Sequence, residues 1–167
     1  MFDLKPLSAA GVPAALEKAS RYRLLNQPEQ AESICHDVLR VDPDHQETVI
    51  ALLLAITDQF GDPRPSSPQS ARALLPRMHG EYDRAYYAGL ICERLALARL
   101  RSGLPNAGET AYDFFREAMA HYERAEAVRP AGNDDPLLRW NSCARVIEAN
   151  PDVRPPAAES DTGVLGD

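Results

Sequence analysis

Two pairs of residues in this sequence have the types and spacing to bind a metal ion or to move a proton. In each pair a glutamate precedes a histidine by four positions: Glu32 with His36, and Glu117 with His121. Residues four apart share one face of a helix, so a carboxylate and an imidazole meet there. Di-iron sites in helical bundles need Glu-x-x-His instead, and that motif does not occur. We interpret both pairs as solvated ion pairs and predict no metal site and no cofactor.

The three cysteines give no sign of a nucleophile. Cys35, Cys92 and Cys143 are far apart and form no C-x-x-C motif. A catalytic thiol needs a base within hydrogen-bonding reach, and the neighbours Cys35 and His36 point in different directions on a helix. Free cysteine packs as a small apolar residue, so we expect all three in the core. Phosphate-binding loops, zinc-protease motifs and nucleophile elbows are also missing from the sequence, and we predict no catalytic residues and no enzyme.

Charge and hydropathy narrow the classes of partner. The 167 residues carry 25 acidic and 18 basic side chains, a net charge of −7. Nucleic-acid binding needs a basic surface, so we predict no nucleic-acid partner. The longest apolar run, residues 49–56, is far shorter than the roughly 20 residues that span a bilayer, so we predict no membrane partner. With no apolar leader at the N-terminus, we expect a cytoplasmic protein.

Prolines divide the chain into helices, because proline is tolerated in the first helical turn or just past a helix end. Apolar residues recur at three and four positions, which favours helix over strand. We therefore predict an all-α fold of about seven helices. Their approximate ranges are 13–25, 28–41, 45–60, 68–78, 82–101, 109–128 and 135–149. We expect Asn26 and Asp44 to cap the second and third helices, and Ser67 to cap the fourth.

Two stretches carry a spacing of small and aromatic residues that is typical of helical hairpins. In residues 12–43, Ala19, Tyr22 and Ala31 occupy small and aromatic positions, and the stretch ends in VLRVDP. In residues 114–130, FFREAMAHYERAEAVRP has the spacing of a second helix and its final proline.

Both stretches resemble the tetratricopeptide repeat, a unit of about 34 residues. The resemblance implies stacked antiparallel helical hairpins in a right-handed superhelix, a domain over residues 12–149. Residues 1–11 are then an N-terminal extension, and we expect 150–167 to form a disordered tail rich in proline and acids. An irregular helical bundle is the alternative.

The resemblance also implies that the first helix of each hairpin lines a concave groove that binds a protein or peptide segment. Transferring its positions gives a larger surface that includes Ser20 and Asp58, and we assign six of its residues to the partner-binding groove: Arg23, Ile50, Leu54, Tyr86, Arg94 and Trp140. The function expected is a non-catalytic binding scaffold, an adaptor or chaperone of a bacterial-type cytoplasm. Two alternatives are a helical metalloprotein or enzyme and a structural subunit that forms a homo-oligomer.

Overall fold

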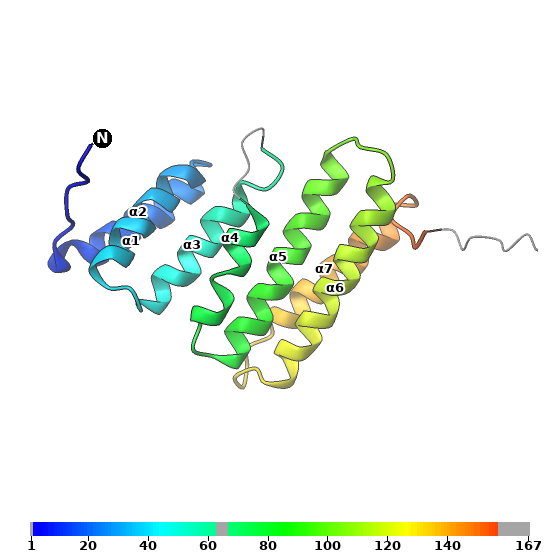
Figure 1. Ribbon diagram of the computed structural model, residues 1–167. Helices are drawn as coiled ribbons and strands as arrows, with labels where there is room; N and C mark the ends of the chain where they lie inside the picture. Colours follow the sequence, from blue (N-terminus) through cyan, green and yellow to red (C-terminus); the bar gives the residue numbers. More distant parts are fainter. Residues whose placement is uncertain (1, 63–66, 157–167) are drawn as a thin grey trace, which may run out of the picture.

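The computed structural model describes residues 2–62 and 67–156. Over these ranges the chain is all-α, as predicted, with seven α-helices, two short 3-10 helices and no strand (Figure 1). The α-helices are α1 (Val12–Leu24), α2 (Pro28–Val41), α3 (Gln46–Asp58), α4 (Pro68–Arg72), α5 (Glu81–Arg101), α6 (Ala107–Ala127) and α7 (Asp135–Ala149). The 3-10 helices are η1 (Ala9–Gly11) and η2 (Leu75–Arg77). None of these helices is both long enough and apolar enough to cross a membrane.

Local chemistry explains most helix starts, with two corrections to the predicted caps. Ser67 caps α4 as expected, because its hydroxyl accepts from the Gln69 backbone N–H at 3.2 Å. The cap of α3 is His45 instead of Asp44, since its Nδ1 accepts from the Thr48 N–H at 3.3 Å. Asn26 caps no helix. It adopts φ 57° in the tight turn between α1 and α2, a left-handed conformation that asparagine tolerates better than most residues.

The fourth helix is shorter than predicted, and Pro76 explains why. We expected residues 68–78, but α4 ends at Arg72 and a separate 3-10 turn, η2, contains Pro76. A proline ring clashes with the carbonyl four residues earlier, which here belongs to Arg72. The helix therefore ends one turn before the proline.

The helices form a row of antiparallel neighbours (Figure 1). α2 packs between α1 and α3, and α6 packs between α5 and α7. The alternate helices α1, α3 and α5 also contact one another in sequence order. α5 joins two apolar cores: Leu90 and Ile91 belong to a core shared with α2 and α3, while Cys92 and Ala96 belong to one shared with α6 and α7. The row thus places three helices side by side along one face.

Small residues lie where helices cross closely. Ala31 and Ala118 are both fully buried, as expected for crossing positions. A Cβ added at Gly89 of α5 would lie 2.7 Å from a ring carbon of Tyr122 on α6. Glycine at this position therefore lets the two longest helices approach each other.

The segment after α7 corrects the predicted tail. We expected disorder from residue 150, but Val153 is only 3% exposed and packs into the core of α5, α6 and α7. A Cβ at Gly108 would collide with the carbonyl oxygen of Asp152, so this backbone lies directly on the start of α6. The proline and acid content of this segment predicted disorder because composition does not show that a single valine is buried. Burial of Val153 is enough to anchor the short segment to the helices. The remainder of the predicted tail, residues 157–167, lies outside the described residues.

Replacing Val153 with alanine should lower the free energy of unfolding by about 1–2 kcal/mol, because two buried methyl groups are removed. Urea denaturation measures the loss. Val128→Ala is the matched control, since Val128 is 42% exposed and should change stability by less than about 0.5 kcal/mol. Equal effects of the two substitutions would mean that the 150–156 segment is not docked in solution.

Candidate functional site

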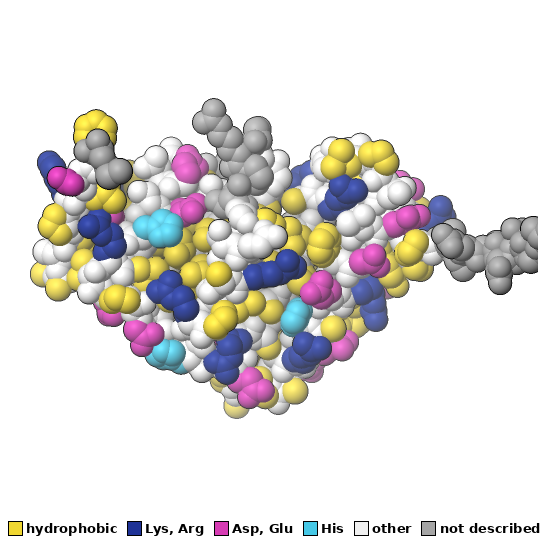
Figure 2. Space-filling model, viewed as in Figure 1, with side chains coloured by type: hydrophobic (Ala, Val, Ile, Leu, Met, Phe, Trp, Pro, Cys, Tyr) yellow, Lys and Arg dark blue, Asp and Glu magenta, His cyan; other side chains and the backbone are white. Residues whose placement is uncertain are grey.

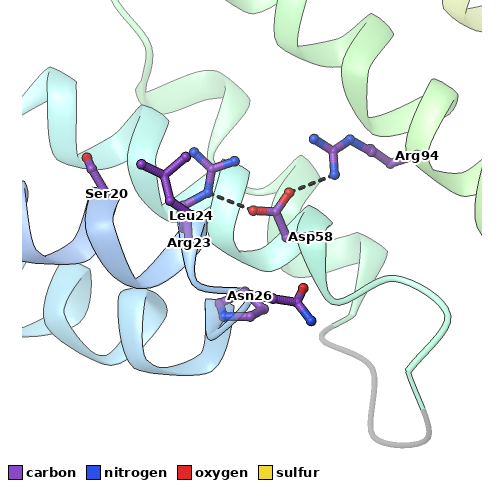
Figure 3. Close-up of a pocket in the computed structure, with 7 residues that line it drawn as sticks. Ser20, Arg23, Leu24, Asn26, Asp58 and Arg94 are labelled. Atoms are coloured by element: carbon purple, nitrogen blue, oxygen red, sulfur yellow. Dashed lines mark hydrogen bonds and ion pairs between the residues drawn. The ribbon is translucent and has the colours of Figure 1, made fainter.

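A cavity with three charged side chains in its lining is built around Asp58, at the last position of α3. Its carboxylate accepts from Arg23 Nε of α1 at 2.7 Å and from Arg94 Nη1 of α5 at 2.6 Å. Figure 3 shows Asp58 between the two guanidinium groups. All three side chains are partly buried, between 19% and 27% exposed. One carboxylate thus connects the three helices that contact one another along the row.

This Arg23–Asp58–Arg94 pocket has a volume of about 410 Å³. Its lining residues are Ser20, Arg23, Leu24, Asn26, Pro28, Asp58 and Arg94. The left-handed turn at Asn26 sets one rim of the pocket, because it reverses the chain from α1 into α2. Two guanidiniums against one carboxylate leave one excess positive charge.

The chemistry of these groups favours binding over catalysis. Arginine stays protonated in proteins, so it cannot serve as a general base. Its planar donors match carboxylates and phosphates, often with two hydrogen bonds at once. Arg23 reaches Asp58 through Nε and Arg94 through Nη1, so each guanidinium has further N–H groups that could face a bound anion.

The structure brings together some of the six predicted groove residues. Arg23 and Arg94 meet at Asp58, as described above. Ile50 and Leu54 are half-buried and pack against the core of α2 and α3. Together with Asp58 they lie four residues apart, so they share one face of α3. α3 therefore presents a half-accessible apolar stripe that ends at the pocket carboxylate.

Tyr86, the fifth predicted groove residue, lies in a cluster of tyrosines. Its ring stacks on Tyr82 at 5.7 Å and meets Tyr87 edge-on at 5.1 Å. It also packs against the buried ring of Tyr122 at 5.7 Å. Tyr86 is thus half-buried by its neighbours and does not line the Arg23–Asp58–Arg94 pocket.

Trp140 packs with Tyr86 against the core of α5, α6 and α7, but it lines a different pocket from Arg23 and Arg94. Its Nε1 donates to Glu123 of α6 at 3.0 Å, and it lines a separate pocket with Glu123, Glu126, Leu137 and Asn141. The α7 side chain that reaches α5 is Arg139, whose Nη1 donates to Glu93 at 3.2 Å. Trp140 therefore does not line the Arg23–Asp58–Arg94 pocket, and its neighbour Arg139 makes the hydrogen bond to α5.

A second group of functional side chains lies between α5 and α6. The Cys92 thiol and the side chains of Glu117 and His121 place one donor atom each within 4.8 Å of the others. Burial raises the pKa of Cys92 to about 12, and nearby Glu117 adds to the shift. Burial also lowers the pKa of His121. The sequence identified the pair Glu117 and His121 but not Cys92, because only the packing of α5 on α6 brings the thiol to them.

Searches of protein-family models, curated proteins and solved structures found no match to this chain. The tetratricopeptide resemblance therefore stays a prediction from the sequence.

Proposed function

We propose that this protein is a non-catalytic scaffold that binds a carboxylate-bearing segment of a partner protein at the Arg23–Asp58–Arg94 pocket. The observation that carries the proposal is the excess guanidinium charge in a partly buried pocket. Water and salt screen a partly buried charge less than a surface charge. The electrostatic attraction for an anion is therefore strongest at this pocket. The scaffold is tetratricopeptide-like and acts as an adaptor or chaperone in a bacterial-type cytoplasm.

A protein segment fits the surroundings of the pocket better than a nucleic acid does. The chain as a whole carries −7, and on the face shown in Figure 2 acidic and basic side chains are interspersed. Apolar side chains flank the pocket: Leu24 at its rim is 89% exposed, and Ile50 and Leu54 lead away from Asp58 along α3. Acidic and apolar side chains at alternating places in a peptide would match this arrangement.

A different role for the same residues is purely structural, an ion-pair network that fastens α1, α3 and α5 together. The two roles predict opposite effects of Asp58→Asn on anion binding. If the pocket binds anions, Asp58 competes with the ligand, and removing its charge raises the pocket from one excess positive charge to two. If the network is only structural, the substitution loosens it and no anion binds more tightly.

Fluorescence anisotropy tests this with labelled nonapeptides that carry leucines and glutamates at varied spacing. Matched peptides have glutamine in place of glutamate. We expect Arg94→Ala and Arg23→Ala to weaken binding of the best acidic peptide by roughly tenfold or more, and Asp58→Asn to tighten it several-fold. The matched control is Arg21→Ala, because Arg21 lies on α1 with its side chain 69% exposed and pairs only with Glu17 among the described residues.

Two results would contradict the proposal. One is equal binding of glutamate and glutamine peptides, which would show that charge is not recognised. The other is unchanged or weaker binding by Asp58→Asn in protein that remains fully helical by circular dichroism.

A further inference from the structure

The donor atoms of Cys92, Glu117 and His121 have the composition of a transition-metal site. They supply one sulfur, one carboxylate oxygen and one imidazole nitrogen, all within 4.8 Å of one another. In the described part of the chain no other such cluster of three donors occurs. We propose that these three side chains bind Zn²⁺ between α5 and α6, at a site independent of the Arg23–Asp58–Arg94 pocket.

Zinc suits this donor set better than magnesium or calcium does. Hard cations prefer all-oxygen ligands, whereas Zn²⁺ accepts thiolate, imidazole and carboxylate in tetrahedral geometry. Three protein ligands leave a fourth position for water or a bound group. Zinc bonds of ~2.0–2.3 Å place tetrahedral ligand atoms ~3.3–3.8 Å apart, so donors within 4.8 Å of one another need to close by about 1.5 Å at most.

One ligand of the site can move toward the metal, whereas another is fixed by packing. Glu117 and His121 lie one turn apart on α6, with Nε2 and Oε1 3.9 Å from each other. The Glu117 side chain is 52% exposed, so it can rotate without disturbing the core. Cys92 is buried one turn from Gly89, where the Tyr122 ring of α6 packs directly on the α5 backbone. The thiol is therefore held in place and the carboxylate is adjustable.

The charges balance when zinc binds. The Cys92 thiol loses its proton to solvent, and its sulfur forms the bond to the metal. Thiolate and carboxylate then carry two negative charges against the two positive charges of Zn²⁺, while His121 binds as neutral imidazole. A site with no net charge is the least costly kind to place at a partly buried helix interface.

Two neighbouring arginines oppose the metal. Arg124, three residues after His121 on α6, lowers the pKa of that imidazole. Arg72, from α4, acts on both the Cys92 thiol and His121, and its positive charge disfavours a cation at the cluster. Zinc binding therefore requires the Arg72 side chain to turn away. This gives the proposal a second, oppositely signed test, because Arg72→Gln should strengthen zinc binding.

A Glu–His pair on α2 serves as a control for the zinc site. Glu32 and His36 form a second pair at four-residue spacing, with His36 Nε2 3.7 Å from Glu32 Oε1. In the described chain no cysteine completes a three-donor cluster with them. If a Glu–His pair at this spacing were enough to bind zinc, His36→Ala would weaken binding as much as His121→Ala does.

Calorimetric titration of the full-length, metal-stripped, reduced protein with ZnCl₂ tests the site. We expect one equivalent to bind. Cys92→Ser, His121→Ala and Glu117→Gln should each weaken that binding by roughly tenfold or more, since even outer partners of metal ligands cost about 10–100-fold. His36→Ala and Asp58→Asn should leave it unchanged, and Arg72→Gln should tighten it. Titration with Co²⁺ should give a thiolate charge-transfer absorption that Cys92→Ser abolishes.

Three results would overturn the proposal: no binding of Zn²⁺ by the intact protein, an equal loss in His36→Ala, or a Co²⁺ spectrum without the thiolate absorption. The Cys92→Ser variant changes a buried residue and could misfold. Glu117→Gln tests the same site without changing the core, because the Glu117 side chain is 52% exposed. The result is separate from peptide binding, since Asp58→Asn changes only the Arg23–Asp58–Arg94 pocket.

Discussion

Replacing Tyr122 with alanine should lower the free energy of unfolding by about 3–5 kcal/mol, the range for removing a large aromatic ring from a core. Tyr122 is fully buried on α6, and its hydroxyl donates to Glu93 Oε2 at 2.5 Å. The substitution leaves a cavity and removes a hydrogen bond from a carboxylate that is only 5% exposed. Urea denaturation measures the effect. Tyr112→Ala on the same helix is the control and should cost clearly less, because Tyr112 is half-buried.

A second substitution tests the contact between Tyr122 and Gly89, where α5 and α6 cross. Gly89→Ala has two opposed effects on the free energy of unfolding. The new Cβ meets the Tyr122 ring at 2.7 Å, and this clash should destabilise the protein by about 1–3 kcal/mol. Alanine also stabilises a helix interior by about 1 kcal/mol relative to glycine. The clash should win in the wild-type protein. In the Tyr122→Ala background the clash is gone, so Gly89→Ala should become stabilising by up to about 1 kcal/mol. The same cost in both backgrounds would mean that this crossing does not set the approach of α5 to α6.

The helices could be predicted because their boundaries depend on short-range chemistry. Pro28, Pro68 and Pro136 each occupy the first or second position of a helix, where the missing N–H costs nothing. The caps were less predictable. Several polar residues precede α3, and backbone geometry selected His45 over Asp44. The turn at Asn26 depends on how α1 and α2 pack, which no local pattern contains.

Part of the candidate site could be predicted, since the resemblance assigned Arg23 and Arg94 to one groove. In the structure both arginines lie on the faces of α1 and α5 that face α3, and both donate to Asp58. The positions on α5 and α7 each depended on one residue of the repeat pattern, Gly89 and Asn141, and a shift of one residue turns a side chain about 100° around the helix axis. On α7, Arg139 occupies the position facing α5. Cys92 was missed because its partners lie on another helix and periodicity within α5 says nothing about them.

Arg139 and Glu93 form the contact in which the loss of one charge should matter most. Glu93 lies on α5 with its side chain 6% exposed, and it accepts from Arg139 Nη1 at 3.2 Å and from the Tyr122 hydroxyl. Removing one partner of a buried ion pair strands the other charge, typically at a cost of about 3–5 kcal/mol. Arg139 is 38% exposed, so water screens part of the pair and the cost is smaller.

Arg139→Leu should therefore lower the free energy of unfolding by about 2–3 kcal/mol. Arg145→Leu, an exposed position on the same helix, should change it by less than about 0.5 kcal/mol. Adding Glu93→Gln to Arg139→Leu should recover most of the loss, because glutamine accepts from Tyr122 without leaving a buried charge. Whether the double variant is more or less stable than Arg139→Leu alone shows the cause of the loss. If the double variant is less stable than Arg139→Leu alone, the penalty is lost packing by the arginine side chain, and a stranded carboxylate plays no part in joining α5 to α7.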